Sequence, residues 1–96
     1  MSARMAARPR RATVWYRGMP YNIDLAQCRR ALVLRQVEGE LDSMESLAIA
    51  VGVSRSTASR FFSGRATSLA VTLKILEALR LTFEEVATAG AEDQAG

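Results

Sequence analysis

Hydrophobic and polar residues repeat with a helical period between Ser43 and Gly64, near the middle of the chain. The first apolar stripe has members at i, i+3, i+4 and i+7, namely Met44, Leu47, Ala48 and Val51. This spacing predicts a short amphipathic helix. Gly52 interrupts the pattern and predicts a left-handed turn, because glycine adopts that conformation with almost no steric cost.

A second short helix is predicted from Ser54, whose hydroxyl can cap free backbone N–H groups, to the residue before Gly64. Three apolar residues share one face of it: Ala58, Phe61 and Phe62. The opposite face carries hydrogen-bonding groups and two positive charges, on Arg55, Ser56, Ser59 and Arg60. Two short helices joined by a glycine turn, with the small Ala48 at their crossing, predict a helix-turn-helix.

A longer helix is predicted before this unit, from about Ile23 to about Glu38. Asn22 is its expected cap, and Gly39 is expected to end it. Its expected core residues are Leu25, Cys28, Leu32 and Val37, with Ala31 and Leu34 close behind.

Two more helices are predicted after Gly64. Ser68 caps the first, whose apolar residues form two adjacent stripes: Leu69, Leu73, Leu76 and Leu79, and then Val71, Ile75 and Ala78. Thr82 and Glu85 form a T-x-x-E capping box that opens a last short helix with two apolar residues, Phe83 and Val86.

A small β-hairpin is predicted near the N-terminus, because β-branched and aromatic residues cluster at Thr13–Arg17 and Tyr21–Ile23 around Gly18-Met19-Pro20. Two strands alone are marginal in water, so the hairpin must pack on the helices or on another subunit. Its aromatic residues, Trp15, Tyr16 and Tyr21, would supply the contact area.

Composition excludes several classes of protein. The chain has 96 residues, which suits one small domain, and no apolar run approaches the roughly 18 residues of a membrane span. Its single cysteine, Cys28, cannot form an internal disulfide and is expected to be a small core residue in a reducing cytoplasm. Histidine is absent, and no acid/base pair, nucleophile or metal cluster stands out, so neither enzyme activity nor a cofactor is expected.

The net charge of +3 is unevenly distributed. Residues 1–22 contain five arginines and no acid, whereas the remainder has eight basic and ten acidic residues. Four of these arginines lie in an N-terminal arm: Arg4, Arg8, Arg10 and Arg11. Such an arm can follow a phosphate backbone or enter a minor groove, and the alternative is a disordered solubilising tail.

The run GVSRSTASRFFSGRATSLAVTLKILEALRLTFEEV resembles the Cro/C1-type (XRE-like) helix-turn-helix family, the fold of small phage repressors. The resemblance covers about residues 23–88. It implies an all-α, five-helix, lambda-repressor-like bundle, here preceded by the hairpin and the basic arm. The expected divisions are a flexible arm at 1–12, the hairpin at 13–24, the DNA-binding domain at 23–88 and a flexible tail at 89–96, with the tail frayed from Ala87 onward.

By this resemblance the second helix of the unit enters the major groove of duplex DNA and reads bases through Arg55, Ser56, Ser59 and Arg60. Phosphate contacts are implied for Ser43, Thr57 and Arg65, at helix starts and in the loop after Gly64. Asp42 or Ser43 caps the first helix of the unit, and Asp42 with Glu45 could form a capping box. The chain departs from the pattern of this family at two positions. The family often has glutamine where this chain has Met44, which is expected to be a packing residue, and it commonly has a helix-ending glycine where this chain has Arg80.

The expected function is sequence-specific DNA binding by a cytoplasmic, nucleoid-associated, bacterial or phage-encoded repressor, acting as a homodimer. The hairpin is the favoured dimer surface and the last helix is the other candidate. The alternative is that the hairpin folds back onto its own helices. One alternative is an antitoxin-type protein that neutralises a toxin partner and represses its own operon. Another is a protein-interaction module that keeps the helix-turn-helix only as a scaffold.

Overall fold

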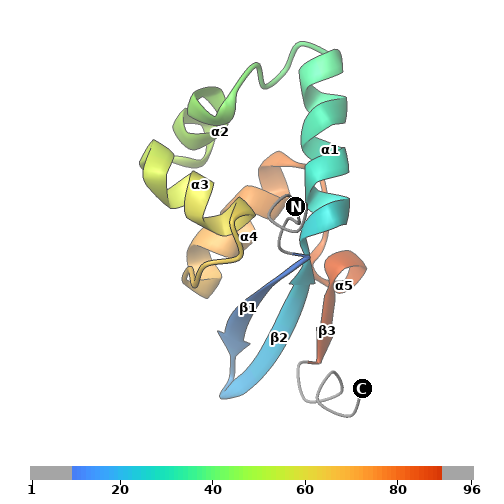
Figure 1. Ribbon diagram of the computed structural model, residues 1–96, viewed down its shortest axis with the longest axis vertical. Helices are drawn as coiled ribbons and strands as arrows, with labels where there is room; N and C mark the ends of the chain where they lie inside the picture. The colour runs from blue at the N-terminus through green and yellow to red at the C-terminus, as the bar shows by residue number, and fades with distance from the viewer. Residues whose placement is uncertain (1–9, 90–96) are drawn as a thin grey trace, which may run out of the picture.

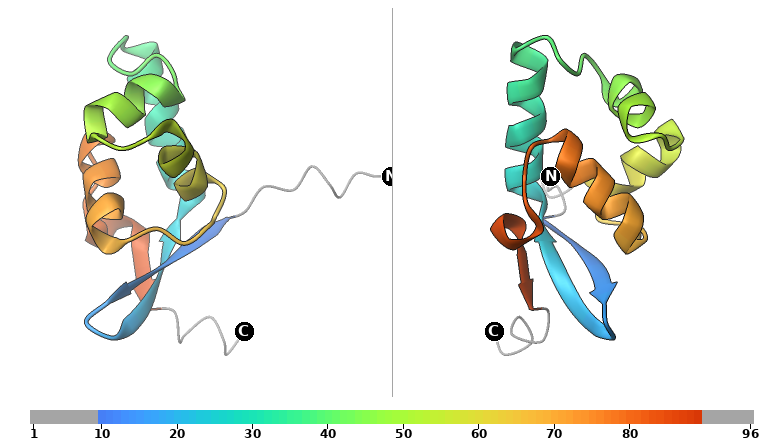
Figure 2. Two further views of the ribbon diagram at one scale, coloured as in Figure 1. Left: turned by 90° about the vertical axis from the view of Figure 1, so that its left-hand side faces the viewer. Right: turned by 180° about the vertical axis from the view of Figure 1, so that it is seen from behind.

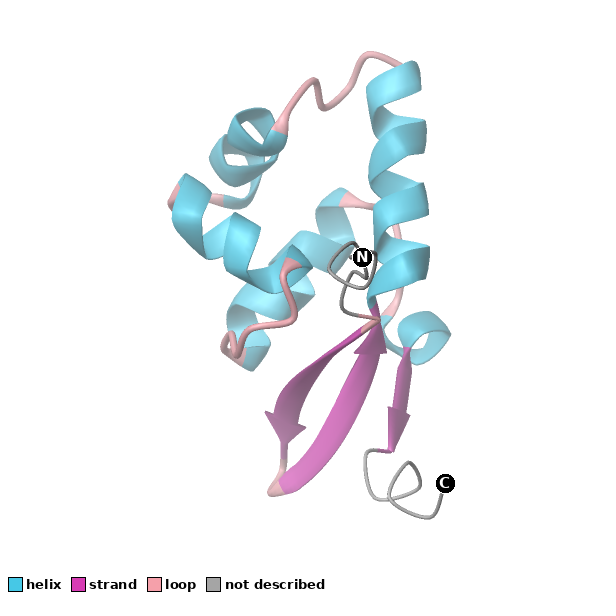
Figure 3. Ribbon diagram, viewed as in Figure 1, coloured by secondary structure: helices cyan, strands magenta, loops and turns pink. Residues whose placement is uncertain are grey.

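The computed structural model describes residues 10–89 and shows a helical bundle beside a three-stranded antiparallel sheet (Figures 1 and 3). The elements follow in the order β1 (Arg11–Tyr16), β2 (Met19–Asp24), α1 (Leu25–Val37), α2 (Met44–Val51), α3 (Arg55–Phe62), α4 (Leu69–Ala78), α5 (Phe83–Val86) and β3 (Ala87–Ala89). The helical bundle agrees with the prediction. The all-α description does not, because three segments of the chain pair as strands.

Strand β3 is the main difference from the expected fold. Its three residues, expected to be a frayed tail, pair antiparallel with Tyr21, Asn22 and Ile23 of β2. The sheet order is therefore β1-β2-β3, with β2 in the centre. The short α5 turns the chain back so that β3 lies along the open edge of β2 (Figure 1).

The hairpin turn is also shifted from its expected position. Arg17 and Gly18 both have left-handed backbone angles, with φ values of 55° and 77°. This two-residue turn matches the twist of the flanking strands. Met19 and Pro20, expected in the turn, instead pair with Tyr16 and Trp15 as the start of β2.

Helix α1 begins later than expected, and it buries four of its six expected core residues: Leu25, Cys28, Ala31 and Leu32. Asn22 and Ile23 belong to the sheet, so Asp24 becomes the cap and its Oδ1 accepts a hydrogen bond from the Gln27 backbone N–H at 3.2 Å. Leu34 and Val37, expected in the core, are 55% and 78% exposed.

Arg35 takes the buried position at the end of α1 instead. Its guanidinium forms salt bridges with Glu38 at 2.9 Å and Glu40 at 3.4 Å. Because both carboxylates lie in the chain leaving α1, they neutralise the charge that Arg35 buries and so allow it to replace an aliphatic residue there.

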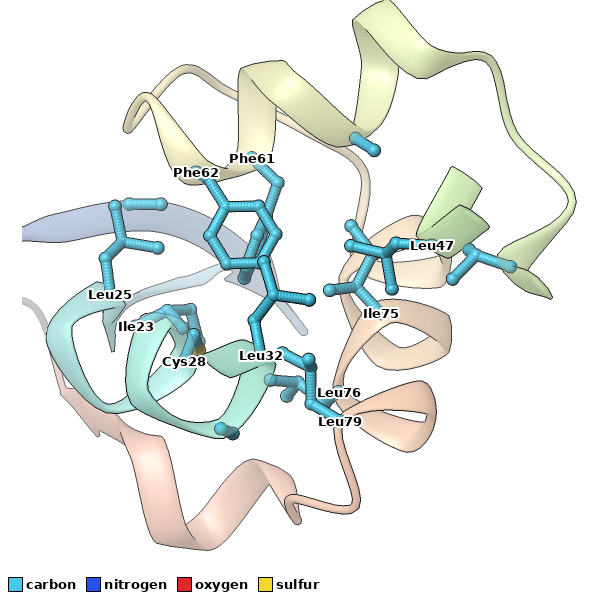
Figure 4. Close-up of a cluster of buried hydrophobic side chains, with 14 of the residues drawn as sticks. Ile23, Leu25, Cys28, Leu32, Leu47, Phe61, Phe62, Ile75, Leu76 and Leu79 are labelled. Atoms are coloured by element: carbon cyan, nitrogen blue, oxygen red, sulfur yellow. The ribbon is translucent and has the colours of Figure 1, made fainter. Parts of the chain in front are cut away.

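The core joins all the helices to the sheet (Figure 4). Its largest fully buried side chains include Phe61 of α3, Leu47 of α2, Ile75 of α4 and Ile23 of β2. In α4 the buried positions are Thr72, Ile75 and Leu76, while Leu73 is 43% exposed. Thr72 is tolerated in the core because its hydroxyl lies 3.0 Å from that of Thr67, within hydrogen-bond distance.

The hairpin folds onto its own chain. Tyr16 and Tyr21 contact Phe83 of α5, with ring centroids 6.1 and 5.4 Å apart. Trp15 points away from this cluster and is 62% exposed. Two of the three hairpin aromatics are therefore engaged within the chain, as is Val86 of α5, which is buried.

Candidate nucleic-acid interface

Helices α2 and α3 form the predicted helix-turn-helix, and they lie next to each other in Figures 1 and 2. The stripe expected on α2 faces the core: Leu47, Ala48 and Val51 are buried, and Met44 packs against them at its edge. Gly52 ends α2 with φ of 84°, a left-handed conformation that favours glycine. This turn sets the angle at which α3 leaves α2.

The start of α3 is fixed by its cap. The Ser54 side chain accepts a hydrogen bond from the Thr57 backbone N–H at 3.1 Å and donates one to the Thr57 hydroxyl at 2.9 Å. Thr57, expected to contact phosphate, is half-buried and part of this cap. The cap holds the first turn of α3 in one conformation.

The two faces of α3 separate as expected. Ala58, Phe61 and Phe62 are buried and hold the helix on the domain. The remaining face is exposed and carries all four predicted base-reading residues: Arg55, Ser56, Ser59 and Arg60. The structure thus brings them onto one surface of one helix.

The end of α3 leads directly into a further positive charge. Gly64 has φ of 79°, and the backbone N–H of Arg65 donates to the carbonyl of Arg60 at 3.0 Å. Arg65 is exposed immediately beyond this turn. Within residues 10–89, none of Arg55, Arg60 and Arg65 forms a salt bridge, so all three charges remain available to an anion.

The start of α2 presents the second predicted phosphate site. Ser43 caps the helix, its side chain accepting a hydrogen bond from the Ser46 backbone N–H at 3.2 Å. The capping box expected between Asp42 and Glu45 does not form, because Ser43 rather than Asp42 occupies the cap position. Exposed backbone N–H groups at a helix start favour an anion.

The basic arm is only partly described. Arg4 and Arg8 lie outside the described residues. Arg11 begins β1, and the carbonyl of Arg10 accepts a hydrogen bond from the Leu25 N–H at 2.9 Å. The boundary expected at residue 12 therefore moves back, because Ala12 is buried in the sheet. The side chains of Arg10 and Arg11 remain exposed.

Arg29 is a residue of this region that the sequence pattern did not single out. From α1 its Nη2 donates to the carbonyl of Phe62 at the end of α3, at 2.9 Å. The two residues are 33 positions apart, and no local motif links them. The contact could be found only from the packing of α1 on α3.

The described part of the chain gives little support for metal binding, for a nucleophilic cysteine or for a membrane span. Residues 10–89 hold no group of three or more histidine, cysteine, aspartate or glutamate residues placed to bind a metal. Burial raises the pKa of the Cys28 thiol from 9.0 to about 12, which suits a core residue and not a nucleophile. No helix among these residues is both long and apolar enough to span a membrane.

Comparison with known proteins supports the helix-turn-helix assignment. Residues 42–86, from the residue before the cap of α2 to the end of α5, match a family model described as Helix-turn-helix. No curated protein and no solved structure matches the chain. The matched segment is shorter than the expected 23–88 and leaves out α1 and the hairpin. This segment is thus similar to the helix-turn-helix family of DNA-binding regulators, in agreement with the expected Cro/C1-type (XRE-like) resemblance.

Proposed function

We propose that the protein is a transcriptional repressor that binds a specific duplex sequence with α3 in the major groove. The observation that carries this proposal is the exposed face of α3, where two arginines and two serines lie between a capped start and a closed end. An α-helix fits the major groove, where each base pair presents a distinct pattern of donors and acceptors. The exposed face supplies the side chains for reading that pattern.

Arg55 and Arg60 are the principal base readers in this proposal. The fork of donors on an arginine fits O6 and N7 of guanine together, which is the commonest specific contact to DNA. Ser56 and Ser59 lie between them and can donate to or accept from either strand. Since no side chain of residues 10–89 forms a salt bridge with either arginine, neither loses an ion pair on binding.

The phosphate contacts flank this face. Arg65, the start of α2 at Ser43, and the half-buried Thr57 are assigned to the backbone. Arg10 and Arg11 would add contacts that weaken as salt concentration rises. These residues fix the position of α3 on the duplex but do not select its sequence.

The functional unit is a homodimer on a partly palindromic site. A single module of this size contacts few base pairs, whereas two-fold symmetry doubles the contacts and places the half-sites about one helical turn apart. This arrangement supplies the discrimination that a repressor needs against competing genomic DNA.

Selection of bound duplexes from a random pool tests the proposal directly. We expect one enriched sequence with two related half-sites. Arg55→Ala and Arg60→Ala should each weaken binding to it by about 1 to 3 kcal/mol and relax preference at one or two base pairs. The matched control is Lys74→Ala, which removes an equal charge from the exposed side of α4. Wild-type affinity and selectivity in both arginine variants would refute the base-reading assignment.

A further inference from the structure

Helix α1 carries an aliphatic stripe that the described chain leaves uncovered. Val33, Leu34 and Val37 are 53%, 55% and 78% exposed. They lie on the opposite side of α1 from its buried residues Leu25 and Cys28. Helices α2, α3 and α4 all lie on the buried side of α1 (Figures 1 and 2). Three adjacent aliphatic side chains on one exposed face are typical of an interface with a partner.

The shape of this stripe suits a second helix. A shallow, mostly apolar hollow lies along α1 between Arg29, Arg30, Val33 and Leu34. Val37, the most exposed of the aliphatic residues, projects one to two turns further along the same face. One face thus carries both a projecting side chain and a hollow, the combination that lets helices interlock.

The charges on this face indicate which partner fits. Arg30 is exposed on one side of Leu34, and Glu38, with a side chain 46% exposed, lies equally far on the other side. If a second copy of α1 packs antiparallel about a two-fold axis at Leu34, Arg30 of each copy faces Glu38 of the other. Parallel packing would instead oppose like charges. The same rotation brings Val37 of each copy toward the hollow of the other.

We propose that this face of α1 is the homodimer surface, formed by antiparallel pairing with α1 of a second copy. The surface is self-complementary, as a two-fold interface requires. The inference specifies the dimer of the proposed function but needs no DNA. The earlier candidates are largely occupied, since Tyr16 and Tyr21 pack on Phe83 of their own chain and Val86 is buried.

Sedimentation of the full chain without DNA, over a range of concentrations, tests the surface. One pair of helix faces is smaller than the interface of a stable obligate dimer, so we expect a reversible, concentration-dependent dimer. Leu34→Glu and Val37→Glu should each raise the dimer dissociation constant at least about tenfold, because a charge replaces a buried aliphatic group. Ile49→Glu is the matched control, since Ile49 is a 75% exposed aliphatic residue on α2.

A charge exchange tests the antiparallel register. Arg30→Glu and Glu38→Arg should each weaken the dimer, because each opposes like charges across the axis. The double variant should restore it, because it re-forms both pairs with their signs reversed. Circular dichroism of every variant checks that the domain stays folded, because Glu38 also bonds Arg35 within the chain.

Several results would overturn this assignment: a wild-type monomer at every concentration, a Leu34→Glu variant that dimerises normally, or a double variant no better than the single ones. Loss of the dimer in Trp15→Glu alone would move the interface to the exposed strand β1. If the proposed DNA binding is wrong but the α1 interface is right, the two experiments give a different combination of results. A protein that dimerises through α1 but enriches no duplex keeps this interface and loses only the repressor function.

Discussion

Arg29 of α1 closes the end of α3 by donating from Nη2 to the backbone carbonyl of Phe62 at 2.9 Å. The last carbonyls of a helix have no partner within it. In α3 those of Ser59, Arg60 and Phe61 accept hydrogen bonds from backbone groups of the following turn. The Phe62 carbonyl is satisfied by Arg29, whose positive charge also lies at the negative end of the helix. The contact fixes the proposed reading helix to α1.

Replacing Arg29 with Met should therefore disturb DNA reading without removing a DNA contact. The variant keeps most of the side-chain stem but loses the donor to Phe62. We expect lower affinity for the selected site and weaker discrimination between related sequences, because α3 can shift relative to α1. Fluorescence anisotropy with the selected duplex and with single-base variants of it measures both quantities.

The salt dependence of binding separates this positioning role from a direct contact. Loss of one phosphate contact lowers the slope of log affinity against log salt by about one unit. For Arg29→Met we expect an unchanged slope, and for Arg29→Lys a partial recovery of discrimination, because lysine retains a charged donor. A slope reduced by one unit would place Arg29 on the phosphate backbone instead.

Arg65→Ala should lower the salt slope and leave base preference unchanged, which is the opposite of the result expected for Arg29→Met. Arg65 is exposed just beyond the turn at Gly64, and no base-reading role is assigned to it. We expect affinity to fall evenly for all sequences and the salt slope to decrease by about one unit. Titrations at several salt concentrations, on selected and unrelated duplexes, provide the test. A changed base preference would contradict the phosphate assignment.

The sequence predicted best those features that depend on neighbouring residues. The turn at Gly52, the cap at Ser54 and the capping box of Thr82 with Glu85 are all confirmed, because each needs only a few consecutive residues. The buried and exposed faces of α3 are confirmed for the same reason, because in one short, strongly amphipathic helix the apolar residues define which side faces the core.

The features that depend on distant pairing were missed. The late start of α1 follows from strand pairing of Asn22 and Ile23, and β3 exists because β2 offers it an open edge. On α1 the hydrophobic pattern identified Leu25, Cys28, Ala31 and Leu32 as buried but wrongly added Leu34 and Val37, because the opposite face also carries aliphatic residues. Arg35 is buried near the end of this helix with Glu38 and Glu40 as its partners, although hydrophobicity places a charged residue on the surface.

Phe61→Ala should strongly destabilise the domain. Phe61 is fully buried and meets Phe62 edge to face, with ring centroids 5.1 Å apart. Removing a buried aromatic ring costs about 3 to 5 kcal/mol, a large share of the roughly 5 to 15 kcal/mol typical of whole domains. Urea denaturation followed by circular dichroism measures the loss. Ile49→Ala, at an exposed site, should change stability by less than about 0.5 kcal/mol.

The stability of the fold should fall at alkaline pH partly through Cys28. Burial, assisted by the nearby Asp24 carboxylate, raises the pKa of the thiol from 9.0 to about 12 in the folded protein, although Arg29 acts in the opposite direction. Above about pH 9 the unfolded chain loses this proton while the folded chain keeps it, so stability falls as pH rises toward about 12. Cys28→Ala, compared over this range by urea denaturation, should show a shallower decline.

The chain passes through Arg80 in a conformation that favours glycine. Arg80 has φ of 61°, and its N–H and that of Leu81 close the end of α4 by bonding to Glu77 and Leu76. The turn expected from glycine therefore forms with arginine in its place. Part of the cost is offset by a salt bridge to Glu40 at 2.9 Å. Both side chains are well exposed, so this bridge is worth at most about 1 kcal/mol.

Two substitutions at residue 80 separate the backbone strain from the salt bridge. Arg80→Ala and Arg80→Gly both remove the bridge, but only glycine relieves the left-handed backbone, by about 1 kcal/mol or slightly more. We therefore expect the glycine variant to be the more stable of the two in urea denaturation. In the middle of a helix the order reverses, because glycine costs about 1 kcal/mol relative to alanine. Ala50→Gly, at an exposed position inside α2, provides that control and should lose stability. An alanine variant at residue 80 more stable than the glycine variant would contradict a left-handed conformation there.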